Sequence, residues 1–386
     1  MNSLLLALVS GETSAGDRAV CAEALRNRGF ELFTELRLAQ VDAIRAGLED
    51  FESWHVLVAF NPLMTGANRR PDAVFADFEI EKAAHLLANL LDDAPRHLRI
   101  APSAEVAAAI AAAILPEAEM RQLQALIATR RDEMATDLPV LADLSRFKYR
   151  AKVELVEWNG AKAVKKTFRS TAHDAMEREL AFFDDIAPHS DVPARVLART
   201  ENAIFYEHIE NRWAVRRLFG FRLPLPLSLP QVRALAGFVR LVVQRGWDPI
   251  DLSPRDNILI DAKSGRLRAI DFEFAHRRAR PVAPVDSYVL SGVPADAIAA
   301  RPLNNAMDHD PYPGKWRPFT GLSKQSFLHD PAWLQWLKRL VVHPAWLAGH
   351  ALGAVARRRK HAVDRDERLS EVVLVFSPPP RAPGPQ

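Results

Sequence analysis

The sequence contains very little cysteine, since Cys21 is the only one among 386 residues. A single thiol excludes a disulfide framework within the chain and a zinc site built from cysteines, and it fits a reducing, cytoplasmic location. An excess of one charge is also lacking, because 51 lysines and arginines face 48 acidic residues and give a net charge of +3. The chain therefore lacks the basic footprint of a nucleic-acid-binding protein, and we expect no nucleic-acid partner.

Long hydrophobic runs are scarce. The run at 3–9 has no basic residue before it and no small-residue cleavage site after it. We therefore expect a buried strand there rather than a signal peptide. The longest apolar stretch near the C-terminus, 340–356, contains Pro344 and is short for a membrane span.

A basic cluster, Arg357-Arg358-Arg359-Lys360, directly follows this apolar stretch. Two interpretations stay open. The segment can be a core helix with a solvated basic end. It can also be a helix lying on an anionic membrane, with its basic cluster at the lipid headgroups. The second interpretation would make the protein peripheral at the inner face of the membrane.

The composition is that of a globular protein with two or three domains, with 48% hydrophobic and 26% charged residues. Up to about Leu138, strand-like segments alternate with helix-like ones. This alternation predicts an α/β, Rossmann-like domain over 1–138 with a mostly parallel sheet. Strands are expected at 4–9, 31–38, 55–60 and 97–101, and helices at 17–28, 41–51, 79–91, 104–115 and 116–134.

After about Pro139 the pattern changes to that of an antiparallel hairpin. Two segments that alternate apolar and polar residues, 149–158 and 161–168, flank Asn159-Gly160, which is typical of a two-residue turn. Helices are expected at 172–186 and 229–245, with strands at 196–198, 204–208, 257–260 and 267–270. The expected regions are a second domain at 139–340, a helical basic segment at 341–376 and a disordered proline-rich tail at 377–386.

Three clusters in this second part carry side chains suited to phosphate chemistry. Lys165 and Lys166 stand on a hairpin strand, with Glu179 on the next helix, and a lysine there can hold phosphates if a carboxylate fixes its ammonium. Asp251 can accept a hydroxyl proton, and an asparagine before an apolar strand can ligate magnesium. Asp271 ends the following strand, where it can bridge a metal to phosphate. Together these groups are the minimum for positional and electrostatic catalysis of phosphoryl transfer.

The motifs AVKKTFR, MERELAFFDDI, FYEHIE, DLSPRDNILID and IDFE follow one another in this order. Because of these motifs and their order, residues 147–295 resemble the protein-kinase-like superfamily. They resemble its small bacterial members more than the eukaryotic protein kinases. Those members are the lipopolysaccharide-core sugar kinases and the aminoglycoside-phosphotransferase-like enzymes. The resemblance implies an α+β two-lobed kinase fold that uses ATP and Mg²⁺.

The resemblance also implies a role for each matching residue. It implies that Lys165 is the catalytic, phosphate-binding lysine and Glu179 its carboxylate partner. It implies that Asp251 is the base and that Asn257 and Asp271 are the metal ligands. It also implies a hinge whose backbone meets adenine, at Glu207 and Ile209. Asp286 is similar to the aspartate that braces the catalytic loop in this family.

The sequence departs from the family pattern at several points. Pro249-Ile250 stands where a histidine usually precedes the base, and six positions rather than five separate Asp251 from Asn257. Either the loop carries a bulge and Asn257 is the metal ligand, or Asp256 takes that place. NILID opens the next strand as in the family, which favours Asn257. Residues 145–148 contain no glycine for a phosphate-binding loop.

The leading hypothesis is an ATP- and Mg²⁺-dependent phosphotransferase acting on a hydroxyl of a small molecule or a glycan, with lipopolysaccharide as one candidate. Only 15 positions separate Asp271 from Asp286, which leaves little room for the activation segment of a regulated Ser/Thr protein kinase. That kinase stays an alternative, and so does a catalytically dead binding module.

Two further segments have two interpretations each. The loop 10–17 follows the first strand and can bind a phosphate or a nucleotide sugar, or it can be a tight turn with a helix cap. The segment 310–321 is rich in aromatic and basic residues. Its Lys315, Trp316 and Arg317 can line an acceptor site for a sugar or an anionic lipid, or the segment can pack on the second domain.

Overall fold

A computed structural model of the chain divides into two compact units, residues 1–135 with 146–150 and 357–386, and residues 136–145 with 151–356. The structure describes 3–64, 73–145, 149–211, 216–218, 221–223, 226–280, 282–294 and 310–375, with the backbone alone at 216–218, 221–223, 348 and 350–368. The predicted disordered tail at 377–386 and residues 146–148 of the glycine-free loop lie outside the described residues.

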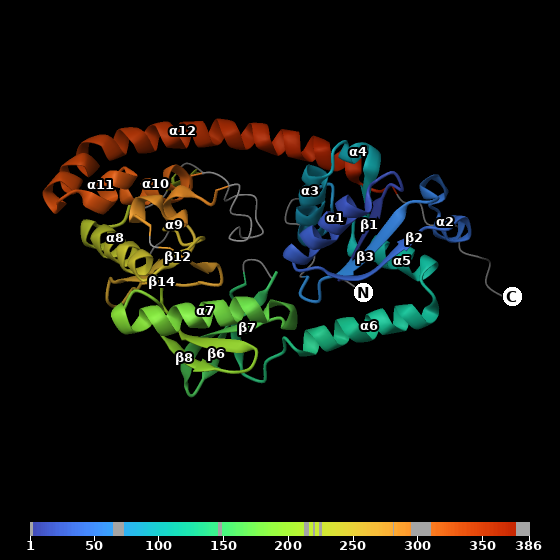
Figure 1. Cartoon of the computed structure of the whole chain (residues 1–386), viewed down its shortest axis with the longest axis horizontal. Helices are drawn as coiled ribbons and strands as arrows, with labels where there is room; N and C mark the ends of the chain where they lie inside the picture. The colour runs from blue at the N-terminus through green and yellow to red at the C-terminus, as the bar shows by residue number, and fades with distance from the viewer. Residues whose placement is uncertain are drawn as a thin grey trace. The chain divides into compact units, whose positions relative to one another are not determined.

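The first unit is built on a four-stranded sheet in the order β2-β3-β1-β4 (Figure 1). Its strands are β1 Leu4–Val9, β2 Glu31–Arg37, β3 His55–Phe60 and β4 Leu98–Ile100. All four were predicted from the sequence within one or two residues of their ends.

The strand directions differ from the prediction. β1 pairs antiparallel with both β3 and β4, and β2 pairs antiparallel with β3. The mostly parallel, Rossmann-like sheet predicted for this domain is therefore wrong. β1 and β2 run in the same direction, but β3 lies between them, which is the split β-α-β arrangement. Apolar strands linked by helices occur in both topologies, so the pattern alone could not separate them.

Helices cover both faces of this sheet because side chains of β1 alternate between them. Leu5, Ala7 and Val9 pack in one core with α1 Ala15–Asn27 and α3 Phe78–Leu90. The intervening leucines of β1 pack in another core with three helices, α2 Gln40–Ala46, α5 Ala104–Ile114 and α6 Glu117–Asp132. The short helix α4 Ala94–His97 precedes β4.

The loop after β1 forms the turn and helix cap. The Ser14 hydroxyl accepts a hydrogen bond from the backbone N–H of Asp17 and donates one to its carboxylate. Asp17 thus places a negative charge in the first turn of α1, where the helix dipole favours an anion. The loop uses its own side chains to satisfy the helix N-terminus.

The second unit begins with a five-stranded antiparallel sheet in the order β5-β6-β7-β9-β8. The predicted hairpin is confirmed, because Asn159 and Gly160 have φ angles of 51° and 76°, as in a type I′ turn. The strands are β5 Val140–Asp143, β6 Ala151–Trp158, β7 Ala161–Phe168, β8 Val196–Arg199 and β9 Ala203–Glu207.

Helix α7 His173–Ile186 lies along this sheet (Figure 1). Strands β8 and β9 follow it in the chain, and a mainly helical region comes after them. That region holds two antiparallel strand pairs, the hairpin of β13 Ile258–Ile260 with β14 Leu267–Ala269 and, on either side of it in the chain, β12 Trp247–Pro249 with β15 Ala275–Arg277. Its further elements are β10 Arg216–Leu218, β11 Phe221–Leu223, α8 Leu229–Gln244, α9 Tyr288–Ser291, α10 Arg317–Thr320 and α11 Lys324–His329.

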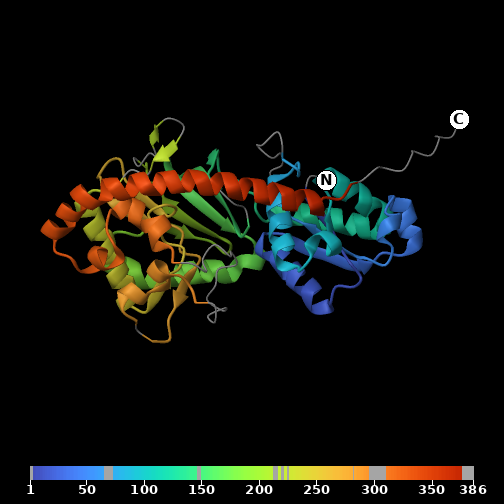
Figure 2. The same ribbon diagram turned by 90° about the horizontal axis from the view of Figure 1, so that it is seen from above.

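The last helix, α12 Ala332–Val372, is a single element of 41 residues with Pro344 inside it (Figure 2). It does not fit the predicted boundary at 340, because it begins in residues of the second unit and ends in residues of the first. Leu369 and Val372, near its end, are buried in the core of the first unit. Among the described residues, no helix combines the length and the apolar character needed to cross a membrane.

Candidate functional site

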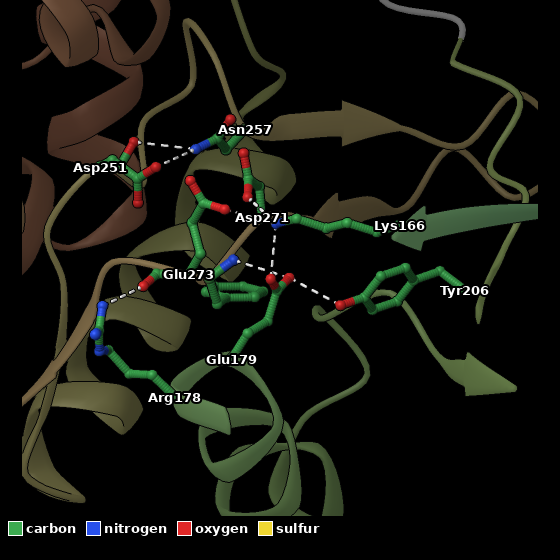
Figure 3. Close-up of polar contacts among 9 residues, drawn as sticks. Lys166, Arg178, Glu179, Tyr206, Asp251, Asn257, Asp271 and Glu273 are labelled. Carbon is green, nitrogen blue, oxygen red and sulfur yellow. Dashed lines mark hydrogen bonds and ion pairs between the residues drawn. The ribbon is translucent and has the colours of Figure 1, made fainter. Parts of the chain in front are cut away.

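A buried lysine in the second unit is surrounded by three carboxylates. The Lys166 ammonium Nζ lies 2.7 Å from Oε2 of Glu179, 2.5 Å from Oδ1 of Asp271 and 3.3 Å from Oε2 of Glu273 (Figure 3). Burial acts to lower the pKa of Lys166, but the carboxylates outweigh it and raise this pKa well above its ordinary value. Lys166 is therefore a fixed cation at the centre of an acidic cluster.

The lysine that pairs with Glu179 is Lys166 and not the predicted Lys165. Side chains alternate across β7, so Val164 and Phe168 pack toward the core that includes α7, together with Lys166. Lys165 points to the opposite face, where its ammonium lies 5.9 Å from the centre of the Phe205 ring. The two lysines are adjacent in the sequence, and what distinguishes them is the face of β7 on which each side chain lies.

Glu179, on α7, is fully buried and held by three donors. Besides Lys166, the Tyr206 hydroxyl donates to Oε1 at 2.8 Å, and the backbone N–H of Phe272 donates to the same oxygen at 3.2 Å. Burial raises the pKa of Glu179, while Lys166 acts in the opposite direction. Tyr206 is not among the site residues predicted from the sequence, although its place on β9 beside β7 follows from the register that pairs it with Val164.

Phe272 anchors the segment that carries Asp271. Its ring is fully buried, stacks on Phe182 of α7 at 4.1 Å and meets Phe183 edge to face at 5.3 Å. Arg178 of α7 also donates to the carbonyl of Glu273 at 2.8 Å. Asp271 itself has a φ of 65°, a left-handed conformation that is uncommon outside glycine. The anchoring on both sides holds Asp271 in this conformation and directs its carboxylate to Lys166.

Asp251 and Asn257 meet across the loop before β13. The Asn257 amide Nδ2 lies 3.2 Å from Oδ2 of Asp251 and 3.3 Å from its carbonyl oxygen. The backbone N–H groups of Asp256 and Asn257 both donate to the carbonyl of Ser253, which makes one helical turn. This turn accommodates the one extra position between Asp251 and Asn257. The N–H of Ile270 donates to the carbonyl of Asn257 at 3.0 Å and so brings Asp271 next to the loop.

Asp251 is held in an environment that disfavours its charge. Burial raises the pKa of its carboxyl well above the ordinary value, and the nearby Asp271 and Glu273 raise it further. Lys166 and Lys315 act in the opposite direction. The buried Oδ1 of Asp251 has no hydrogen-bond partner among the described residues. A buried acceptor without a partner is costly, and such atoms often mark a place where a ligand binds.

The carboxylate of Asp256 contacts Ser253 and Lys315. Its Oδ2 lies 3.3 Å from the Ser253 hydroxyl and 3.6 Å from the ammonium of Lys315. Of the two candidates for the metal ligand, Asn257 contacts the carboxylate of Asp251 through its side chain. Lys315 was predicted only as part of an acceptor segment, and the fold brings it to the loop 251–257.

The other two residues of that acceptor segment have structural contacts. Trp316 is fully buried in the core of the second unit. The guanidinium of Arg317 lies 4.9 Å from the ring of Trp346 on α12. Of the predicted trio, only Lys315 lies beside the candidate site.

The brace of the loop differs from the prediction. Asp286 makes no side-chain hydrogen bond or ion pair with any described residue. Asp248, fully buried in β12, accepts hydrogen bonds from the backbone N–H groups of Tyr288 and Val289 at 2.6 and 2.8 Å and from Arg278. Burial raises the pKa of Asp248, whereas these donors lower it. The aspartate that links the two segments is therefore Asp248, three positions before Asp251, and not Asp286 of the later segment.

The predicted hinge residues do not direct side chains to the cluster. Glu207 forms an ion pair with Arg268 and accepts a hydrogen bond from the backbone N–H of Arg195 at 2.7 Å. These three residues line a separate cavity of about 620 Å³. Ile209 is partly buried against the core. A contact of these two residues with adenine through the backbone stays a prediction.

The oxygen atoms of the cluster fit a hard divalent cation. Carboxylate oxygens of Glu179, Asp271 and Glu273 lie within 4.8 Å of one another. Magnesium prefers oxygen ligands, and the three carboxylates exceed the single charge of Lys166. Lys166 contacts Oδ1 of Asp271, so Oδ2 is the oxygen of that carboxylate open to a metal. The amide nitrogen of Asn257 is used by Asp251, which leaves its carbonyl oxygen for the same purpose.

Neither the protein-family models nor the curated proteins compared with this chain match it.

Proposed function

We propose that the second unit is a protein-kinase-like, ATP- and Mg²⁺-dependent phosphotransferase that acts on a hydroxyl of a small-molecule or glycan acceptor. The observation that supports it most is one cluster that joins the Lys166–Glu179–Asp271 contacts with the Asp251 loop (Figure 3). Phosphoryl transfer needs a cation for the phosphates, oxygen ligands for a metal and a base for the hydroxyl. Strands β6 and β7, helix α7 and the β13–β14 hairpin also follow one another in the order that the resemblance implies.

Each residue has a distinct part in this proposal. Lys166, oriented by Glu179, binds phosphate oxygens of ATP. Asp271 and Asn257 hold magnesium, which when bound neutralises charge on the phosphates. Asp251 accepts the proton of the acceptor hydroxyl at its unpartnered Oδ1.

The acceptor side of the proposal rests on Lys315. Its ammonium, 3.6 Å from Asp256, adds a cation beside the loop that carries Asp251. A cation there favours an acceptor with negative groups, and a phosphorylated glycan such as the lipopolysaccharide core meets this requirement. A cytoplasmic location, where ATP and magnesium are available, fits the same chemistry.

The test is phosphoryl transfer by the full-length chain from labelled ATP, with and without Mg²⁺. Acceptors are core glycans, aminoglycosides and a Ser/Thr-containing protein. We expect label on a glycan or small molecule, and Asp251→Asn lowers the rate by about 10²–10⁴-fold. Label on the protein alone supports the Ser/Thr kinase. Nucleotide binding without turnover supports the non-catalytic module, and an unchanged rate in Asp271→Ala rejects the assignment of the site.

A further inference from the structure

The first part of α12 exposes large apolar side chains. Trp333 and Val341 are 67% and 68% exposed, and Trp336, Leu337 and Leu340 are 56%, 46% and 55% exposed. Their spacing of three and four residues puts all five on one side of the helix. We call these five residues the apolar face of α12.

The side of the same helix that carries Gln335, Arg339 and His343 faces the protein. Gln335 is 2% exposed and donates to the carbonyls of Ser326 and Phe327 at 2.9 and 3.3 Å. Arg339 donates to the carbonyl of Leu227, and His343 lies 3.1 Å from the carbonyl of Pro318. These polar contacts fix the rotation of the helix, so the outward direction of the apolar face is built into the fold.

This arrangement is the reverse of an ordinary surface helix, which buries its apolar side. Exposed apolar patches of this kind mark places where a protein meets a partner or a membrane. Two tryptophans, Trp333 and Trp336, stand within the patch. Tryptophan is enriched where proteins meet the interface between lipid headgroups and acyl chains.

The charge of the same helix points to the nature of the partner. From Ala332 to Val363 the sequence contains no aspartate or glutamate. Its basic residues are the cluster Arg357–Lys360, together with Lys338 and Arg339, which contact Asp330 and the carbonyl of Leu227. An anionic surface complements this segment in both respects, since it offers negative charge and an apolar layer beneath. A helix with one apolar face can lie in the surface of a bilayer with that face toward the acyl chains.

We propose that the apolar face of α12 binds the surface of an anionic lipid membrane, with residues 333–341 lying in the plane of the interface. Trp333, Trp336 and their apolar neighbours enter the boundary between headgroups and acyl chains. The basic cluster Arg357–Lys360 adds electrostatic attraction to the headgroups. The proposal goes beyond the phosphotransfer reaction and stands on different residues, so either can fail alone.

The experiment is co-sedimentation of the full-length protein with two kinds of vesicle, phosphatidylcholine alone and phosphatidylcholine with phosphatidylglycerol. We expect binding to the anionic vesicles only, weakening as salt is added. Trp333→Gln with Trp336→Gln abolishes this binding. Substitution of the four residues 357–360 by glutamine weakens it by roughly fivefold for each charge removed near the surface. Val41→Gln, at an equally exposed position on α2, is the matched control and leaves binding unchanged.

A second measurement needs no variant. Hydrogen–deuterium exchange of the wild-type protein is expected to slow at 333–341 when anionic vesicles are added. The proposal is overturned by absent binding to anionic vesicles, by equal binding of the double tryptophan variant, or by unchanged exchange. Self-association without lipid that the double variant abolishes would also overturn it and assign the face to a second copy of the chain.

Discussion

Lys166 on β7 and Glu179 on α7 are 13 positions apart in the sequence, and their charged groups meet at 2.7 Å. This ion pair joins the sheet of the second unit to its neighbouring helix. Glu179 also accepts the backbone N–H of Phe272, so the same carboxylate sets the position of the segment with Asp271. The pair therefore couples three elements, and a shift of α7 would alter all three together.

The two adjacent lysines provide the first prediction. Lys166→Met removes the cation from the cluster and should lower phosphotransfer by roughly 10²–10³-fold, as the loss of a preorganised electrostatic contact does. Lys165→Met is the matched control, with the same chemical change on the opposite face of β7, and should stay within about twofold. Initial rates at saturating Mg-ATP measure both, and a larger loss for Lys165→Met contradicts the assignment.

The fold is expected to survive Lys166→Met. Lys166 lowers the pKa of Glu179, so its loss lets Glu179 take up a proton in place of a buried, unpaired charge. Circular dichroism and thermal unfolding of the two lysine variants separate a loss of function from a loss of structure.

The loop 251–257 provides the second prediction, which concerns magnesium. Asn257→Ala should raise the Mg²⁺ concentration for half-maximal rate by at least about tenfold, because even outer-sphere partners of a metal are worth about 10–100-fold in affinity. Asp256→Ala, one position earlier, should change it little, since Asp256 faces Ser253 and Lys315. A magnesium titration of the rate measures both. The opposite order of effects would assign the ligand role to Asp256.

The third prediction concerns the contact of α10 with α12. Gly321 has a φ of 72°, and a Cβ there would lie 2.5 Å from Nδ1 of His343. Gly321→Ala should therefore destabilise the second unit by about 1–3 kcal/mol through backbone strain and this clash.

The control for Gly321→Ala is Gly237→Ala, inside α8. A Cβ at Gly237 meets nothing within 4 Å, and alanine is preferred over glycine in a helix by about 1 kcal/mol. Thermal unfolding should thus show opposite signs, with a lower midpoint for Gly321→Ala and an equal or higher one for Gly237→Ala. Equal midpoints for the two variants would mean that α12 does not pack on Gly321 in solution.

The fourth prediction concerns pH. Burial lowers the pKa of His343, Arg339 and Arg317 lower it further, and the carbonyl of Pro318 acts in the opposite direction. With a folded-state pKa below the unfolded value of 6.5, the folded state binds fewer protons near that pH. The contribution of His343 to stability is therefore complete above about pH 6.5 and is lost as the pH falls through the folded pKa.

His343→Gln keeps a donor for Pro318 and cannot titrate, so it isolates this effect. Urea unfolding at about pH 7.5 and about pH 5 should show a larger loss of stability in the wild-type protein than in the variant. The other histidines contribute equally to both proteins. An identical loss in the two would exclude a buried, neutral His343.

The positions of the elements could be predicted from the sequence. The turn at Asn159-Gly160 is set by local φ preferences, and the apolar strand Leu4–Val9 by burial on both faces. Glu179, Asp251, Asn257 and Asp271 could be chosen because their order and spacing match one chemistry. Turn preferences and burial patterns are local properties of the sequence, and motif spacing depends only on distance along the chain.

The tertiary structure decided what depends on direction and on pairing across the chain. The choice of Lys166 over Lys165 follows from which face of β7 meets α7. The antiparallel first sheet follows from the insertion of β3 between β1 and β2, which hydrophobic patterns do not encode. The outward apolar face of α12 arises because the polar contacts of Gln335 and His343 fix how the helix is rotated, against the usual rule of burial. Periodicity shows that a helix has two sides, and only its neighbours decide which side meets the solvent.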